Sequence, residues 1–287
     1  MAENPKLPPP PDFPDTPDSA NFFGRPSYLP AELQEERIPP TIRRETEFWT
    51  TGRGLVLNME SADALLEAQE LMSDVYMSGV LEEMGLNPKA KGQESNKGHS
   101  VRDAVISLLI NQELPPQAKV RSRILAIGAI FHDIGKLDEK INPIVMSNER
   151  YPKDHPNRRI IELHPIIGAE VAIRMPGIEI IEERALIARI IRQHHELMDG
   201  SGYPDKLTGP AICKEARVLT VADVADAMGE ERPYKQILPP QSIMRAIKAD
   251  TEKGKYDREV CFAFQKLYGK SGMIVRHRIS NRPERLA

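Results

Sequence analysis

The chain has 287 residues, a formal net charge of −3 and seven histidines, which is enough for one large domain or two smaller ones. This near-balanced charge argues against a nucleic-acid polymer as the main partner, because nucleic-acid-binding domains usually carry a basic excess. No apolar run reaches the roughly 18 residues of a membrane helix, so we expect no membrane span. The two cysteines form no CxxC pair and the N-terminus lacks a signal-peptide pattern, which together indicate a cytoplasmic protein with reduced thiols.

The N-terminal part of the chain divides into two regions. Residues 1–40 are rich in proline and poor in apolar residues, and such a stretch cannot offset the entropy of ordering, so we predict a disordered tail. Residues 41–90 are predicted to form a short helical region. Its main helix would begin at Ser61 as the N-cap and end at Gly85, because apolar residues recur between them at three- and four-residue steps.

The rest of the chain is dominated by helical patterns. A loop is predicted at 86–97, a main domain at 91–268 and a basic, solvated tail at 269–287. Alternating strand patterns are nearly absent, so the predicted fold class is all-α. Helices are expected at about 100–112, 118–134, 163–174, 179–196, 213–229, 240–252 and 256–268.

Several of these helices carry polar residues where a core would normally be apolar. His132 and Asp133 end a helix that is apolar almost all round, and a carboxylate there faces the negative end of the helix dipole. Asp223 and Asp226 lie inside another nearly apolar helix, where an aspartate is costly unless it is paired or bound to a metal. His194 continues a stripe of isoleucines that is predicted to face the core.

Three further histidines extend this pattern. His99 opens one helix, His164 opens another, and His195 follows His194 directly. Any one of them alone could be a satisfied core histidine or an N-cap. A core rarely tolerates so many polar groups without a shared partner, so the whole set indicates a metal centre. Two ions bridged by one aspartate accommodate so many ligands better than a single ion does.

The order of these residues is similar to that of a known family. His132-Asp133 in HDIGK, with His99 upstream and His164 and Asp223 downstream, resembles the HD superfamily of metal-dependent phosphohydrolases. HHELMDGSGYP at 194–204 and RPYK at 232–235 resemble the HD-GYP branch, whose members hydrolyse cyclic di-GMP. The resemblance covers roughly residues 95–268, and it implies an HD-superfamily helical bundle with a dinuclear metal site in its core.

The resemblance also implies roles for individual residues. The first metal would be held by His99, His132, Asp133 and Asp223, and Asp133 would bridge to a second metal held by His164, His194 and His195. Asp133 and Lys136 would be catalytic. Substrate contacts would come from Lys136, which matches the family lysine at the scissile phosphate, and from Tyr203, Arg232 and Lys235.

The implied reaction is hydrolysis of cyclic di-GMP to linear pGpG by a hydroxide that bridges the two ions, and the sequence does not decide between pGpG and GMP as the final product. Fe or Mn would suit these ligands best, and Ni, Co or Zn can occupy them too. The alternatives are an HD-superfamily phosphohydrolase for another nucleotide, a metal-binding signalling scaffold with little activity, and a di-iron oxygenase. The sequence leaves open whether the chain forms a homodimer or binds a signalling partner.

Other positions qualify the resemblance. Some family members complete a third metal site with a glutamate that falls at Ser95 here, so we predict two ions. Asp199 is expected to brace the GYP turn or a ligand histidine. The polar segment NERYPKDHPNRR at 148–159 is expected to form a loop beside the site that acts as a lid or selectivity element, with His155 as a surface histidine.

Overall fold

The computed structural model describes residues 57–90, 93–147, 149–152, 154–229, 238 and 240–271. The predictions for the Pro-rich tail and for most of the basic C-terminal tail lie outside these residues. Within the described residues the chain is helical, with two isolated β-bridges and no strands, which confirms the all-α prediction there. In the same ranges, no helix combines the length and the apolar character needed to span a bilayer.

The helices follow one another with short connections. They are α2 (Met59–Met77), α3 (Val80–Glu83), α4 (Gln93–Glu113), α5 (Ser122–Phe131), α6 (Asn142–Met146), α7 (Pro156–Ile161), α8 (His164–Arg174), α9 (Ile181–Gln193), α10 (Lys214–Gly229), α11 (Pro240–Glu252) and α12 (Arg258–Ser271). Short 3₁₀ turns lie at Pro116–Ala118, Ile134–Leu137 and Gly209–Ala211.

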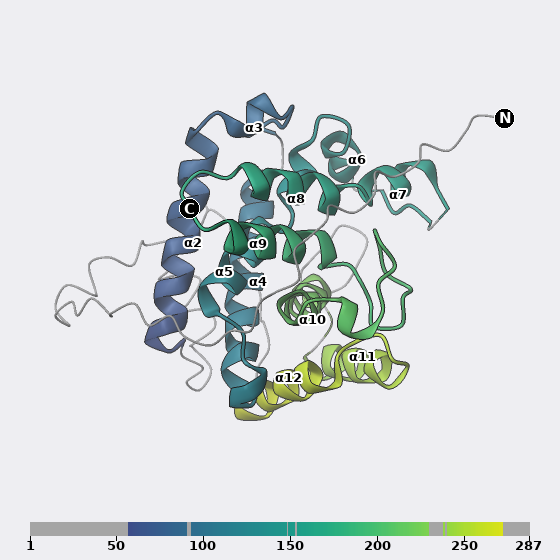
Figure 1. The fold of residues 1–287 in the computed structure, drawn as a ribbon. Helices are drawn as coiled ribbons and strands as arrows, with labels where there is room; N and C mark the ends of the chain where they lie inside the picture. Colours follow the sequence, from purple (N-terminus) through teal and green to yellow (C-terminus); the bar gives the residue numbers. More distant parts are fainter. Residues whose placement is uncertain are drawn as a thin grey trace, which may run out of the picture. The chain divides into compact units, whose positions relative to one another are not determined.

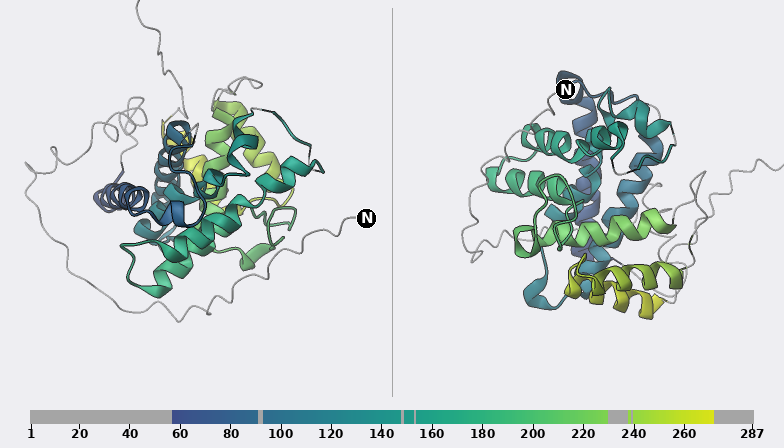
Figure 2. Two further views of the ribbon diagram at one scale, coloured as in Figure 1. Left: turned by 90° about the horizontal axis from the view of Figure 1, so that it is seen from above. Right: turned by 90° about the vertical axis from the view of Figure 1, so that its right-hand side faces the viewer.

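Helix α5 lies at the centre of this bundle. Its residues 124–131 are all buried, as expected for a helix that is apolar on every face. Helices α2, α4, α9 and α10 pack against it, and α8 packs on α9 (Figure 1). Helices α11 and α12 pack together at one end of the bundle, beside α10, as a second direction of view also shows (Figure 2). The end of α5 therefore lies deep inside the bundle.

Two glycines allow the segment after α5 to approach α8 closely. A Cβ atom at Gly135 would lie 2.1 Å from the carbonyl oxygen of His164, and one at Gly168 would lie 3.4 Å from a side-chain carbon of Ile134. Because neither glycine has a Cβ atom, the 3₁₀ turn at Ile134–Leu137 can rest directly on the start of α8. This contact places Asp133 and His164 next to each other.

Helix α2 begins earlier than predicted. Its N-cap is Asn58, whose side-chain oxygen accepts a hydrogen bond from the backbone N–H of Ser61 at 2.9 Å. The predicted N-cap, Ser61, is instead buried inside the first turn. Only Ser61 is predicted as the N-cap from the sequence, and Asn58, three positions earlier, is also a residue type that caps helices well.

Other predicted boundaries were also wrong. The helix predicted to continue to Gly85 ends at Met77, and Gly79, with φ of 80°, separates it from α3. Helix α4 begins at Gln93, inside the predicted loop at 86–97. The helix predicted at 118–134 is α5, which begins only at Ser122 and ends at Phe131. Before it, the side chain of Asn111 donates to the carbonyl of Val120 and accepts from its N–H, each at 2.9 Å. These two hydrogen bonds use the backbone N–H and carbonyl of Val120 and so keep Val120 outside the helix.

We predict that Gly135→Ala destabilises the fold strongly. The new methyl group would collide with backbone atoms of α8, and such overpacking costs roughly 2–3 kcal/mol. The free energy of unfolding from urea denaturation measures the loss. Gly98→Ala is the matched control, since its Cβ atom would meet only the Arg102 side chain at 3.5 Å, and a glycine-to-alanine change inside a helix should be neutral or stabilising. Equal stability of both variants would disprove the close-contact argument.

Candidate metal centre

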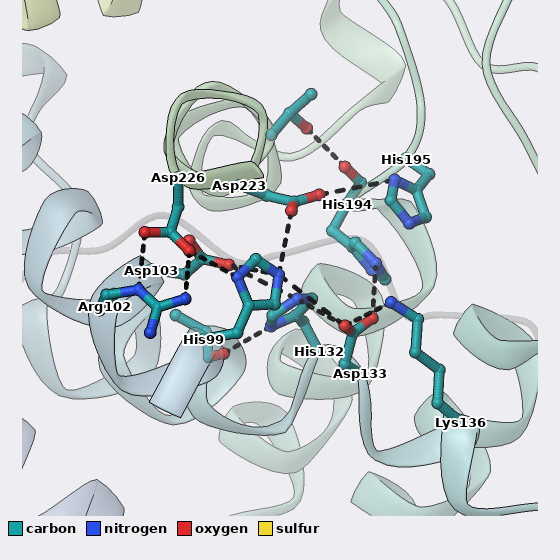
Figure 3. A network of polar contacts seen from close by, with 12 residues as sticks. His99, Arg102, Asp103, His132, Asp133, Lys136, His194, His195, Asp223 and Asp226 are labelled. Carbon is teal, nitrogen blue, oxygen red and sulfur yellow. Dashed lines mark hydrogen bonds and ion pairs between the residues drawn. The ribbon is translucent and has the colours of Figure 1, made fainter. Parts of the chain in front are cut away.

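Side chains from several helices converge into two groups of candidate metal ligands in the middle of the bundle (Figure 3). The first group is His99, Asp103, His132 and Asp223, and the second group is Asp133, His164, His194 and His195. Within each group the ligand atoms all lie within 4.8 Å of one another. The structure thus brings together all seven metal ligands that the sequence predicts and adds Asp103 to them.

Three of the histidines are oriented in the same way. In His132, His164 and His194, the ring Nδ1 donates to the backbone carbonyl three residues earlier, at 2.7, 2.7 and 2.6 Å respectively. Because a carbonyl can only accept, Nδ1 carries the proton in each ring. The lone pair of a neutral ring then lies on Nε2, which faces the interior of the site, as in protein metal centres.

His99 is oriented by a carboxylate instead. Its Nδ1 lies 2.7 Å from Asp226 Oδ2, and Arg102 donates two hydrogen bonds to the same carboxylate, at 2.8 and 2.9 Å. This leaves His99 Nε2 facing Asp103 and Asp223, each at 3.3 Å. Asp226, which the sequence shows as a buried aspartate in need of a partner, therefore supports a ligand of the first group.

Asp133 lies between the two groups. Its Oδ1 is 3.2 Å from His164 Nε2 and 3.9 Å from His194 Nε2. Its Oδ2 is 3.4 Å from His132 Nε2 and 4.0 Å from His99 Nε2. Each carboxylate oxygen thus faces a different group, which is the arrangement that a bridging ligand requires.

Several atoms in this centre lack the partners that buried polar atoms normally have. Among the described residues, His132 Nε2, Asp133 Oδ1 and both oxygens of Asp103 are buried without a hydrogen-bond partner. His164 Nε2 and His194 Nε2 approach to 3.3 Å, although both rings carry their proton on Nδ1. Such unpartnered atoms are rare in native proteins, and a cation in each group would satisfy them. Imidazole and carboxylate donors suit divalent transition metals.

Burial keeps the histidines of the second group neutral. It lowers the pKa of His194 well below its usual value, and the nearby rings of His195 and His132 lower it further. Burial also lowers the pKa of His164 and that of His195. A neutral ring is the form that binds a metal, so this half of the site is prepared for an ion without first losing protons.

The pKa values of Asp133, Asp103 and His99 depend on neighbouring charges as well as on burial. Burial raises the pKa of Asp133, but the charges of His132 and Lys136 outweigh it and hold the pKa well below its usual value. In the first group, burial raises the pKa of Asp103 well above its usual value. For His99, burial lowers the pKa, yet the neighbouring carboxylates, led by Asp103, bring it well above its usual value. The first group therefore binds protons more readily than the second, in keeping with its larger number of carboxylates.

The exposed edge of the site is formed by Lys136, His195 and Tyr203. Lys136 Nζ lies 2.5 Å from Asp133 Oδ2, and its side chain is 20% exposed. The side chain of His195 is 24% exposed, and the Tyr203 ring is tilted over it with ring centroids 4.7 Å apart. The centre is therefore partly accessible to solvent at Lys136 and His195.

Hydrogen bonds and close backbone contacts fix the GYP turn next to His195 of the second group. Asp199 accepts hydrogen bonds from the N–H and hydroxyl of Ser201 at 2.9 and 2.6 Å, so it braces the turn as expected. Glu196 accepts from the backbone of Asp205 at 2.6 Å. A Cβ atom at Gly202 would lie 2.5 Å from the His195 carbonyl oxygen, so only glycine lets the turn pass this close to the ligands.

The polar segment at 148–159 lies partly beside this edge. Its end forms the start of α7, which the sequence analysis did not predict. His155 is not part of either ligand group; it N-caps α7 by accepting from the N–H of Asn157 at 3.1 Å. The guanidinium of Arg158, in α7, lies 5.6 Å from the centroid of the Tyr203 ring.

Some predicted residues could not be placed, and one functional candidate was missed. Arg232 and Lys235 lie outside the described residues, as does the side chain of Ser95. Asp103 was missed although it follows His99 by four residues, which places both on one face of α4. That spacing was the available signal.

Comparison with known proteins supports the motif reading. The family model for the HD domain matches residues 89–260. A 3′3′-cGAMP-specific phosphodiesterase 3 of Vibrio cholerae is 30% identical over 208 residues, covering 72% of this chain and 42% of that protein. A cyclic di-GMP phosphodiesterase of Thermotoga maritima is 30% identical over 255 residues, covering 86% of this chain and 65% of that protein. The chain thus spans less than two thirds of the length of either relative.

We predict that Asp226→Asn weakens metal binding by about 10- to 100-fold, because a residue that orients a ligand histidine usually contributes that much to affinity. Calorimetric titration of the chelator-treated protein with Mn(II) measures the change. Asp257→Asn is the matched control: Asp257 is also buried and pairs with Lys214 and Arg217 at 3.0 and 3.1 Å. It should lose stability and keep its Mn(II) affinity. The same loss of affinity in both variants would contradict the orienting role.

Proposed function

This chain belongs to the HD-domain family and, through its HD and GYP motifs, to the HD-GYP branch. We propose that it is a metal-dependent phosphodiesterase that hydrolyses cyclic di-GMP to linear pGpG, with GMP as the alternative final product. The observation that carries the proposal is the position of Asp133 between two groups of ligands, with Lys136 beside it. The curated relatives support the substrate class, since their names specify cyclic di-GMP or 3′3′-cGAMP.

The proposed cofactors are two divalent ions, with Fe or Mn preferred and Ni, Co or Zn also compatible with the donors. His99, His132 and Asp223 would hold one ion, His164, His194 and His195 the other, and Asp133 would contact both. When bound, such a pair of ions acts as a Lewis acid, orients water for in-line attack and makes it acidic enough to ionise near neutral pH. The unpartnered lone pairs described above fit this donor role.

Lys136 is proposed to stabilise the transition state. Its ammonium group now pairs with Asp133 Oδ2 at the edge of the site. A lysine at this position can bind a phosphoryl oxygen of the substrate and offset the charge that develops during phosphoryl transfer. Asp133 and Lys136 are therefore the proposed catalytic pair, one acting through the ions and the other on the phosphate directly.

The remaining substrate contacts are proposed for the residues around the opening. Tyr203 offers an aromatic face and a hydroxyl next to His195, and Arg158 lies over the same ring. Arg232 and Lys235 keep their predicted role as phosphate-binding residues on the strength of the motif alone. Arg158 belongs to the segment proposed to act as a lid, and its guanidinium adds positive charge at the entrance.

A second substrate, 3′3′-cGAMP, is supported by a specific observation: the relative that matches over 72% of this chain is named for it. The test is turnover of both cyclic dinucleotides by the protein reconstituted anaerobically with Fe(II) and, separately, with Mn(II). Linear dinucleotide products, resolved by chromatography, are the expected result. Two bound ions without any product would indicate another phosphorylated substrate, and a protein that binds no ion would be a signalling scaffold.

We predict that Asp133→Asn loses both ions and at least about 100-fold in turnover, because one carboxylate serves both positions and its charge is what the ions bind. Metal content from elemental analysis of the purified variant, together with its turnover, checks this. Loss of one ion alone would limit Asp133 to a single group, and full activity would refute the bridging role.

Lys136→Gln should behave differently. We predict unchanged metal content and a fall in kcat of about 10²- to 10³-fold, the usual cost of removing one group that stabilises transition-state charge. Lys140→Gln is the control, since Lys140 is exposed and lies four residues further along, and it should keep wild-type turnover. A parallel loss of metal in the Lys136 variant would count against its phosphate role.

A further inference from the structure

Asp103 is the most unusual residue of the centre. Its side chain is completely buried in α4, and neither of its oxygens has a hydrogen-bond partner among the described residues. A buried carboxylate without hydrogen bonds is strongly disfavoured unless a cation compensates it. Its neighbour in the sequence, Arg102, donates two hydrogen bonds to Asp226. These hydrogen bonds from Arg102 go to Asp226 and not to Asp103, so they do not explain how the buried carboxylate of Asp103 is compensated.

The geometry directs this carboxylate into the first group. Asp103 Oδ2 lies 3.3 Å from His99 Nε2 and 3.6 Å from His132 Nε2 (Figure 3). His132 Nδ1 donates to a carbonyl, so Nε2 is the ring nitrogen that faces the carboxylate. Neither this Nε2 nor the Asp103 oxygens have a hydrogen-bond partner among the described residues, and a cation between them would contact both. The fourth member of the group, Asp223, adds a second carboxylate within the same 4.8 Å limit.

We infer that Asp103 is a protein ligand of the ion in the first group, in addition to His99, His132, Asp223 and the shared Asp133. This inference rests on the proposed function only in requiring a metal ion there. With Asp103 included, three carboxylates and two imidazoles surround the first ion, whereas one carboxylate and three imidazoles surround the second. The first position is then nearly filled by protein donors, and the second is the more open.

The unequal donors imply unequal metal preferences. Carboxylate-rich sites favour hard cations such as Mn(II), while imidazole-rich sites suit Zn(II), Co(II) and Ni(II) as well. We therefore expect the first position to discriminate in favour of Mn(II) more than the second does. Loss of Asp103 would make the two positions more alike.

The test uses Asp103→Asn in the full chain, stripped of metal by a chelator and titrated calorimetrically with Mn(II) in the absence of nucleotide. The affinity of one site is expected to fall at least about tenfold while that of the other site is retained. The melting temperature of the metal-free variant should equal or exceed that of the wild type, because the change replaces a buried carboxyl group whose oxygens have no hydrogen-bond partner among the described residues. Only the loss of a metal ligand is expected to weaken metal binding while leaving the stability of the metal-free protein undiminished.

Ser107→Ala is the matched control. Ser107 lies one helical turn beyond Asp103, is completely buried, and its hydroxyl also lacks a hydrogen-bond partner among the described residues. This variant should keep wild-type Mn(II) affinity at both sites. If Asp103→Asn does not fold, Asp103→Val, which replaces the carboxylate by an apolar group of similar size, gives the same two readouts.

Two outcomes would overturn the inference. Wild-type Mn(II) affinity at both sites in the Asp103 variants would show that the carboxylate is not a ligand. A lower metal-free melting temperature with unchanged affinity would make Asp103 a structural counter-ion of protonated His99. Turnover of cyclic di-GMP by the wild type is measured in a separate assay. A wild-type protein that binds two ions without any turnover would contradict the proposed function but not the assignment of Asp103 as a ligand.

Discussion

The carboxylate of Asp133 lies in the buried centre of the bundle with imidazole nitrogens of His99, His132, His164 and His194 within 4.0 Å. An ionised carboxylate at this depth requires positive charge and hydrogen bonds around it, and Lys136 provides one such contact at Oδ2 alone. Its other oxygen has no hydrogen-bond partner among the described residues. The need to compensate this charge explains why so many polar side chains from distant parts of the chain gather at one point.

Helix ends solve the problem of orienting the ligands. The carbonyls that fix His132, His164 and His194 belong to the last turns of α5, α7 and α9. Carbonyls in a last helical turn have no partner within the helix and must find one elsewhere. A histidine placed just after the helix satisfies such a carbonyl through Nδ1 and is thereby turned so that Nε2 faces inward. Stability of the helix end and orientation of the ligand come from the same hydrogen bond.

The two halves of the centre differ in charge and in access. The first group is buried between α4 and α10, carries two carboxylates of its own and is supported by the Arg102–Asp226 pair. The second group consists of neutral histidines around Asp133 and borders the opening at His195 and Tyr203. This asymmetry suits a division of roles in which one position anchors an ion and the other meets the substrate.

The sequence by itself determined the helical class, the positions of α8, α10 and α11 to within about one residue, and the seven motif residues that the structure gathers in one place. These features follow from local information: a period of 3.6 residues, Gly and Pro as boundaries, and polar residues placed on apolar faces. The motif supplied the pairing of distant segments, which no periodicity contains.

Only the tertiary structure decided the rest. Asn58 rather than Ser61 caps α2, because the Asn58 side chain accepts a hydrogen bond from the Ser61 N–H. Helix α5 starts late because Asn111 forms hydrogen bonds with the backbone of Val120. Asp103 looks like an ordinary polar position of an amphipathic helix until α10 packs against α4 and buries it. Whether a carboxylate is solvated or enclosed depends on which helix covers it, and that is a property of the packed bundle that the local sequence does not encode.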